Sequence, residues 1–201
     1  FRLFATPERT LRYLSCIAVG LPIWFAVGVL VALCARFAEA GGSPGVIVGK
    51  AVMWAYVGIS VGDLLSGFLS QALGSRRKVI FGYLVFLSLV SIVYLNLKGL
   101  SPNQFYAMTF LIGSGVGYWA LFVTVASEQF GTDIRSTAAN TVPNFVRGGV
   151  VPITLGFTAL SPRFSVTGAA FIVGAVCLLL AFAAVAYLKE SFGKDLDYLE
   201  G

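Results

Sequence analysis

The sequence predicts an all-α membrane protein with six transmembrane helices. Hydrophobic residues make up 58% of its 201 positions, and charged residues make up only 11%. A soluble domain carries about 25% charged residues, with which it covers its surface. The apolar residues fall into stretches of about 20 residues, the length that a helix needs to cross the hydrocarbon core. Because lipid offers no partners to backbone groups, we expect these stretches to be helices.

Intervals without charged residues locate three of the six helices. They contain 23, 19 and 25 residues, at 13–35, 79–97 and 164–188. A fourth apolar stretch lies within 99–127, and two further stretches are each interrupted by one charge, Asp63 or Arg147. The expected helices therefore cover 11–35, 46–73, 79–97, 104–128, 138–160 and 166–188.

Positive charges are unequally divided between the two sides of these six helices. One side carries nine Lys and Arg residues, and the other carries four. The positive-inside rule places the richer side, with both termini, in the cytoplasm. We therefore expect a cytoplasmic lead-in at 1–10 and a cytoplasmic tail at 190–201. Because the chain begins with Phe and not Met, we interpret it as a fragment of a longer polypeptide.

The two isolated charges are expected at the same depth in the membrane. Asp63 precedes the end of its helix by ten residues, and Arg147 lies ten residues after Thr137, next to the start of its helix. Each is then about 15 Å from the membrane surface, near the middle of the hydrocarbon core. A charge there costs roughly 2.5–3.5 kcal/mol on insertion scales and is rarely without function. Their opposite signs predict either a buried ion pair or two groups that line one polar cavity.

Polar residues share the helix face of each charge, at spacings of three and four residues. Two such stripes facing each other would form the wall of a hydrated cavity. The alternative is a structural ion pair that only joins two helices. Arg147 can bind a carboxylate or phosphate through two hydrogen bonds, which favours an anionic solute, and Asp63 is a candidate for a group that takes up a coupling proton. The candidate solute-binding or coupling residues are Asp63, Arg147, Tyr56, Ser60, Asn140 and Asn144.

Several other classes of protein are disfavoured by composition. The sequence has no His, the commonest general base and metal ligand, and its three Cys lack the spacing of a zinc site. The net charge of +5 is spread in small clusters, unlike a nucleic-acid surface. An intramembrane protease would need a base for a serine nucleophile or a second carboxylate beside Asp63. We therefore expect no enzyme activity, metal, cofactor or nucleic-acid partner.

A loop motif joins the second expected helix to the third. The segment GFLSQALGSRRK, residues 67–78, places Gly67 and Gly74 before the basic pair Arg76 and Arg77. In spacing and position it resembles the loop motif of the major facilitator superfamily. Gln71 stands where that motif usually has an acidic residue, a departure that affects the motif's own bridge between acid and Arg.

A second segment, SEQFGTDIRST, lies between the fourth and fifth expected helices. Glu128, Phe130, Thr132 and Arg135 match the Glu-rich stretch before the eleventh helix of the same family, and Gly131 stands where Pro is commoner. The two motifs cover about a quarter of the chain, whereas the six-helix pattern covers all of it. The resemblance implies that residues 1–201 form the C-terminal transmembrane domain, helices seven to twelve, of a twelve-helix transporter.

The resemblance also implies an architecture and a mechanism. The six helices would form two three-helix repeats of inverted topology, and the first, second, fourth and fifth would line a pathway used by alternating access. The expected function is secondary active transport, as a proton-coupled symporter for a small organic solute, in the bacterial inner (plasma) membrane. A cytoplasmic gating network would be formed by Gly67, Gly74, Arg76, Arg77, Glu128 and Arg135.

Two readings of the isolated chain stay open. If it is half of a transporter, its partners are the small-molecule solute, the lipid bilayer and a missing N-terminal six-helix half, and the isolated half is expected to self-associate. The alternative is a standalone six-helix membrane channel or structural protein.

Overall fold

The computed structural model describes residues 2–193 and 197–199, and within these ranges it contains helices and connecting segments but no strand. The expected all-α class is confirmed for this part of the chain. Residues 194–196 and 200–201 of the expected tail lie outside the described ranges. In chain order the elements are the 3-10 turn η1 (Arg2–Phe4), α1 (Pro7–Phe25), the π-helix η2 (Ala26–Val31), α2 (Cys34–Ala40), α3 (Val48–Leu73), α4 (Arg76–Asn96), α5 (Pro102–Gly115), α6 (Trp119–Glu128), α7 (Thr132–Gly148) and α8 (Val150–Tyr187).

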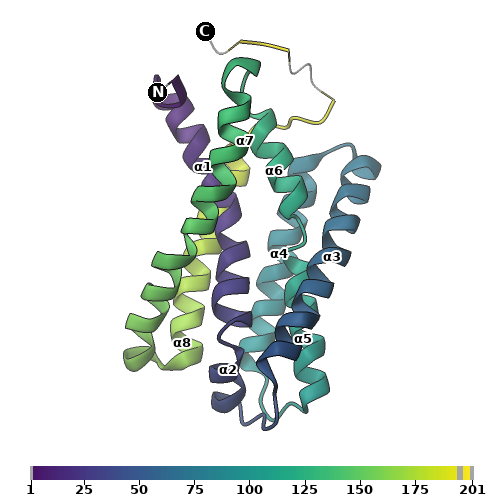
Figure 1. The fold of residues 1–201 in the computed structure, drawn as a ribbon, viewed down its shortest axis with the longest axis vertical. Coiled ribbons are helices and arrows are strands. Elements are labelled where there is room, and N and C mark those ends of the chain that lie inside the picture. The colour runs from purple at the N-terminus through teal and green to yellow at the C-terminus, as the bar shows by residue number, and fades with distance from the viewer. Residues whose placement is uncertain (1, 194–196, 200–201) are drawn as a thin grey trace.

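Five helical stretches of the described chain are long and apolar enough to cross a membrane. The last of them, Thr132–Tyr187, contains 56 residues, and the chain reverses direction within it. Figure 1 shows the chain descending through α7 into α8 and then returning along α8. The reversal occurs at Ser165, whose φ of 65° and ψ of 169° interrupt the helix. Its hydroxyl accepts a hydrogen bond from the Gly168 amide at 3.2 Å and so caps the returning segment.

Several helix ends differ from the expected ones for local reasons. The third pass begins at Arg76 and not at 79, because Ser75 caps it by accepting a hydrogen bond from the Lys78 amide. The fifth begins at Thr132 and not at 138, so Arg135 lies within α7. The fourth pass begins at Pro102 and is broken into α5 and α6. The first continues through a π-helix to α2, which ends at 40 and not at 35.

Helix α1 lies in the interior of the bundle and packs against α6, α7 and α8 (Figure 1). Buried tyrosines join the first pass to its neighbours, because a buried phenolic hydroxyl needs a hydrogen-bond partner. The Tyr118 hydroxyl donates to the Val19 carbonyl at 3.0 Å, and the Tyr94 hydroxyl donates to the Leu30 carbonyl at 3.1 Å. These bonds fix the broken fourth pass and the third pass against the same central helix.

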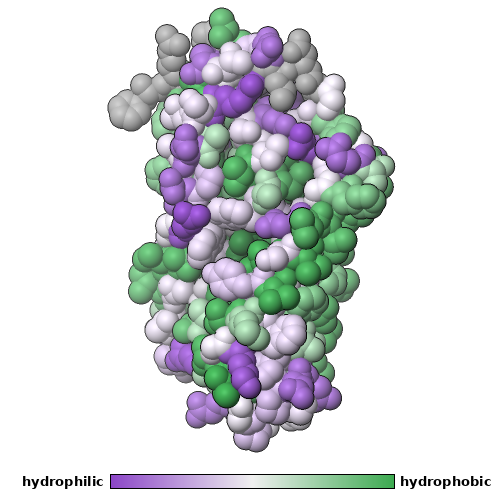
Figure 2. Space-filling model, turned by 45° about the vertical axis from the view of Figure 1, so that its right-hand side comes forward, coloured by the Kyte–Doolittle hydropathy of each residue, from purple (hydrophilic) through white to green (hydrophobic). Residues whose placement is uncertain are grey.

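The surface of the bundle is apolar along α3, α4 and α8 and mixed elsewhere. Leu64 and Phe68 of α3 are 78% and 70% exposed, and Leu179 of α8 is 68% exposed. Figure 2 shows a lengthwise band of hydrophilic and intermediate residues between hydrophobic flanks. Exposed apolar side chains of this size suit contact with lipid or with another protein surface.

Candidate functional site

The fourth pass is interrupted between Gly115 and Trp119, which leaves α6 as a separate ten-residue helix. Helix α3 crosses the interruption at very short range. A Cβ added to Gly62 would lie 2.5 Å from the Ser114 carbonyl oxygen and 2.8 Å from the Gly117 Cα. Only glycines allow the two backbones to approach this closely. The interruption therefore places the exposed amides at the start of α6 beside the residue that follows Gly62.

That residue is Asp63, which the structure places at the N-terminus of α6. The Ala120 amide donates to Asp63 Oδ1 at 3.1 Å. The first amides of a helix lack partners within the helix and carry the positive end of its dipole, so a carboxylate is stabilised there. The sequence left open whether Asp63 joins an ion pair or lines a polar cavity; the structure shows that its carboxylate accepts a hydrogen bond at the start of a helix.

Arg147 reaches the same turn of α6 from α7. Its guanidinium carbon lies 5.7 Å from the centre of the Trp119 ring, within the range of a cation–π contact. Its side chain is exposed. Among the residues that the structure describes, no ion pair joins Asp63 to Arg147. Asp63 and Arg147, which were predicted to share a depth, therefore both contact the start of α6. Asp63 accepts a hydrogen bond from the Ala120 amide, and Arg147 lies over the Trp119 ring.

Trp119 and Trp24 complete the surroundings of this turn. Their rings meet edge to face with centres 6.4 Å apart, and the buried Trp24 indole N–H has no hydrogen-bond partner among the described residues. The sequence analysis did not select either tryptophan. The sequence did contain an indication of this break, because three glycines at 113, 115 and 117 precede Trp119. Closely spaced glycines in an apolar segment are typical of an interrupted membrane helix.

The other four candidate solute-binding residues lie on exposed faces of α3 and α7. The side chains of three of them donate to their own helices: Ser60 to the Tyr56 carbonyl at 3.0 Å, Asn140 to the Ser136 carbonyl at 2.8 Å and Asn144 to the Asn140 carbonyl at 2.8 Å. The amide oxygens of both asparagines remain available as acceptors. We refer to the first turn of α6, with Trp119 and Ala120, together with the side chains of Asp63 and Arg147 beside it, as the α6 start.

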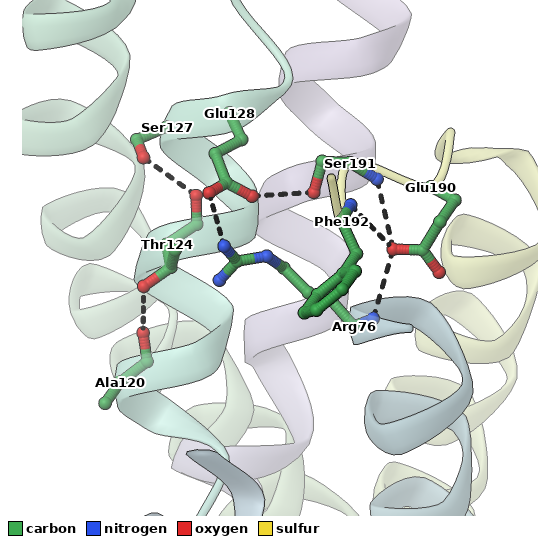
Figure 3. A network of polar contacts seen from close by, with 8 residues as sticks. All are labelled: Arg76, Ala120, Thr124, Ser127, Glu128, Glu190, Ser191 and Phe192. Carbon is green, nitrogen blue, oxygen red and sulfur yellow. Dashed lines mark hydrogen bonds and ion pairs between the residues drawn. The ribbon is translucent and has the colours of Figure 1, made fainter. Parts of the chain in front are cut away.

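A second polar cluster lies at the other end of α6 (Figure 3). Arg76 Nη2 of α4 pairs with Glu128 Oε1 at 2.7 Å, and the Ser191 hydroxyl donates to Glu128 Oε2 at 2.7 Å. The two charged side chains are only 20% and 9% exposed. The Arg76 guanidinium also lies 5.9 Å from the centre of the Phe192 ring. The ion pair joins the start of α4 to the end of α6, and the Ser191 hydrogen bond adds the segment that follows α8.

Glu190 is an unexpected member of this cluster. Its carboxylate accepts hydrogen bonds from the Ser75 hydroxyl and from the amides of Arg76 (3.0 Å), Arg77 (3.2 Å), Ser191 (3.1 Å) and Phe192 (3.1 Å). Partial burial raises the pKa of the Glu190 carboxyl, but the hydrogen bonds together outweigh it, so the pKa lies below its ordinary value. A residue expected in the tail thus caps α4.

The remaining members of the expected gating network have separate contacts. Arg77 Nη2 donates to the Ala186 carbonyl at 2.8 Å, and Arg135 Nε donates to the Phe130 carbonyl at 3.2 Å. Gly74, with φ of 56°, ends α3 in the left-handed conformation that glycine favours. Gly67 is exposed, and a Cβ there would meet nothing within 4 Å.

Replacing Glu190 by Gln should destabilise the folded protein near neutral pH. Because the folded-state pKa is lowered, the charged carboxylate stabilises the fold above the ordinary glutamate pKa of about 4.3. This stabilisation is lost as the pH falls through the folded-state pKa. Loss of a charged helix cap should cost about 1 kcal/mol at pH 7. Thermal unfolding in detergent from pH 7 downward measures it; the difference from the unaltered protein should shrink below about pH 4.3. Glu39→Gln, an exposed change in α2, is the control, and an equal loss there would contradict the assignment.

The described residues contain no group of three His, Cys, Asp or Glu side chains that could hold a metal ion. No protein-family model matches the chain. Over 128 residues the chain is 32% identical to the cis,cis-muconate transport protein of Acinetobacter baylyi. This similarity covers 59% of the present chain and 30% of that protein. The chain thus matches less than a third of the length of this relative.

Proposed function

We propose that this chain is the C-terminal six-helix half of a secondary active transporter that moves a small organic anion by alternating access. The observation that carries the proposal is the α6 start, where a carboxylate and a guanidinium from two other helices meet an interrupted membrane helix. The similarity to a muconate transport protein supports transport as the activity. The resemblance of the two loop motifs supports the major facilitator superfamily as its family.

Interrupted helices at mid-membrane suit solute binding because they expose backbone groups away from lipid. The break is followed by the ten residues of α6 and preceded by the fourteen of α5. At 1.5 Å per residue, the α6 start lies about 15 Å from one end of the span, close to the middle of the hydrocarbon core. A solute bound there would be reachable from either side as the two halves of a transporter rock.

Arg147 is the proposed anion ligand. Its guanidinium is exposed, held against Trp119, and engaged in no ion pair with the described residues. A guanidinium binds a carboxylate through two parallel hydrogen bonds, and stacking on an aromatic ring reduces the side-chain entropy lost on binding. The proposed solute class is therefore small organic acids that carry at least one carboxylate. The asparagine oxygens on the same face of α7 could accept hydrogen bonds from the rest of the solute.

Asp63 is the proposed coupling group. Its carboxylate accepts a hydrogen bond from the Ala120 amide and lies beside the same turn of α6 as Arg147. Binding and release of a proton there would change the charge that the solute anion meets, so proton and solute movements would be linked.

An N-terminal six-helix half is the proposed partner of the exposed polar faces of α3 and α7. Polar side chains on these membrane-spanning helices need a facing polar surface or water. The limited coverage of the muconate transport protein is consistent with a second half of the molecule. We propose two inverted three-helix repeats within the present half and insertion in the bacterial plasma membrane with both termini in the cytoplasm.

Uptake by the full-length parent protein in proteoliposomes tests the proposal. Labelled dicarboxylates, monocarboxylates and neutral sugars should be compared with and without an imposed pH gradient. Arg147→Gln should lower carboxylate uptake about 30-fold or more, because unpairing one buried carboxylate costs at least about 2 kcal/mol. Arg163→Gln, an exposed change at the turn of α8, should leave uptake unaltered.

Three outcomes would each contradict a different part of the proposal. Preferential uptake of a neutral sugar would remove the anion assignment. Flux that only equalises concentrations, whatever the pH gradient, would favour the standalone channel. Full carboxylate uptake in Arg147→Gln would remove Arg147 from the binding site while leaving transport itself intact.

A further inference from the structure

A cavity of about 570 Å³ lies on the outer side of the bundle, between the start of α4 and the end of α8. It is separate from the α6 start, although Arg77 at its rim is also a member of the expected gating network. The residues that decide its chemistry are Ser75, Arg77, Lys78, Phe81, Ala186 and Glu190. It therefore combines charged groups at its rim with an aromatic ring and helix surface below them.

The charges at this cavity leave an excess of one positive charge. Glu190 is its acidic member, and its oxygens already accept five hydrogen bonds from Ser75 and from backbone amides. Arg77 donates to the Ala186 carbonyl at 2.8 Å, which fixes its guanidinium at the rim. The Lys78 side chain is exposed and joins no ion pair among the described residues. The rim is thus suited to an anion with oxygens for both cations.

The surface below the rim is apolar. Phe81 is 50% exposed, and its ring meets Phe182 of α8 edge to face with centres 5.3 Å apart. Farther along the same two helices, large apolar side chains remain exposed: Val85, Leu89, Val176, Leu179 and Leu180. A ligand seated here would meet positive charge at one end and a hydrocarbon-compatible wall along the rest of its length.

We propose that this cavity binds an anionic diacyl phospholipid. The phosphate lies between Arg77 and Lys78, and one acyl chain follows Phe81 along the seam between α4 and α8. A free phosphate would use only the rim, whereas a lipid uses the rim and the aromatic wall. Basic residues at a membrane surface attract anionic lipid, and this cavity supplies a defined seat for one molecule. The inference is independent of which solute the protein carries.

Lipid titration of the detergent-purified full-length parent protein tests the site. Native mass spectrometry should count bound phosphatidylglycerol, phosphatidylcholine of the same chain length, and inorganic phosphate. Phosphatidylglycerol should bind more tightly than phosphatidylcholine. Lys78→Gln should weaken its binding about fivefold, the effect of one cation near a membrane surface. The matched control is Lys98→Gln, an exposed Lys→Gln change at the opposite end of α4, which should leave binding unchanged.

A second variant distinguishes the contribution of the acyl chain to lipid binding from that of the headgroup. Phe81→Ala should weaken binding of a long-chain phosphatidylglycerol but not of one with short chains. Equal binding of the two headgroups, equal loss in Lys78→Gln and Lys98→Gln, or no loss in Phe81→Ala would overturn the lipid site. Displacement of phosphatidylglycerol by millimolar phosphate would assign the rim to a free anion instead.

Discussion

Replacing Asp63 by Asn should abolish proton-driven solute accumulation while leaving the protein folded in the membrane. Asn keeps the shape of the side chain and an oxygen that can accept from the Ala120 amide, so the cap of α6 is retained. It cannot take up or release a proton. Uptake of the labelled solute into proteoliposomes with an inward proton gradient measures the effect, and the expected accumulation is indistinguishable from background.

Measuring the exchange of internal for external solute shows whether this variant has lost proton coupling or solute binding. Exchange requires no net proton movement, so Asp63→Asn should retain it within a few-fold of the unaltered protein. Asp133→Asn, the same change in the first turn of α7, is the matched control and should accumulate solute normally. Undiminished accumulation in Asp63→Asn would exclude Asp63 from proton coupling, whereas loss of exchange as well would make it a binding residue.

Replacing Gly113 by Ala should cause a large loss of stability for the addition of a single methyl group. The added Cβ would lie 2.8 Å from the carbonyl carbon and 2.9 Å from the Cα of Ala55 on α3. Both are backbone atoms, which cannot rotate away as a side chain would. Overpacking costs about 1–3 kcal/mol, and a neighbour made of backbone atoms favours the upper end. Thermal unfolding in detergent should show the loss.

Gly67→Ala is the matched control, since it adds the same methyl group to a helix where nothing lies within 4 Å. Ala is a better helix former than Gly by about 1 kcal/mol, so this variant should be as stable as the original protein or more so. Similar unfolding temperatures for the two variants would contradict the close approach of α3 and α5. A loss of transport in a stable Gly67→Ala protein would support a role for Gly67 in gating.

The passes of the chain could be predicted from sequence because one physical variable determines them. Charged residues are costly in hydrocarbon, so apolar runs of about 20 residues mark the helices. Ser75 and Ser165 shift or create helix ends by accepting single backbone hydrogen bonds, which hydropathy does not detect. The π-helix of the first pass likewise leaves no mark in an apolar run.

The candidate site was predictable only in part. Counting residues predicted a shared depth for Asp63 and Arg147, and the structure places both side chains beside the first turn of α6. Their separate contacts depend on where the fourth pass breaks, which sequence spacing did not determine. Glu190 was not selected because its partners at 75–77 are more than 110 residues away along the chain. A local pattern cannot reveal a cap supplied from such a distance.

Because α6 is short, it should behave as a rigid element between the contacts at its two ends. Ten residues span about 15 Å, and a helix of under three turns has little freedom to bend. Asp63 and Arg147 contact the first turn of α6. At its last residue, Glu128 pairs with Arg76 and accepts a hydrogen bond from Ser191. If Asp63 takes up a proton as proposed, a tilt of α6 at its start would also displace Glu128 and so act on the ion pair with Arg76 at the other end of the helix.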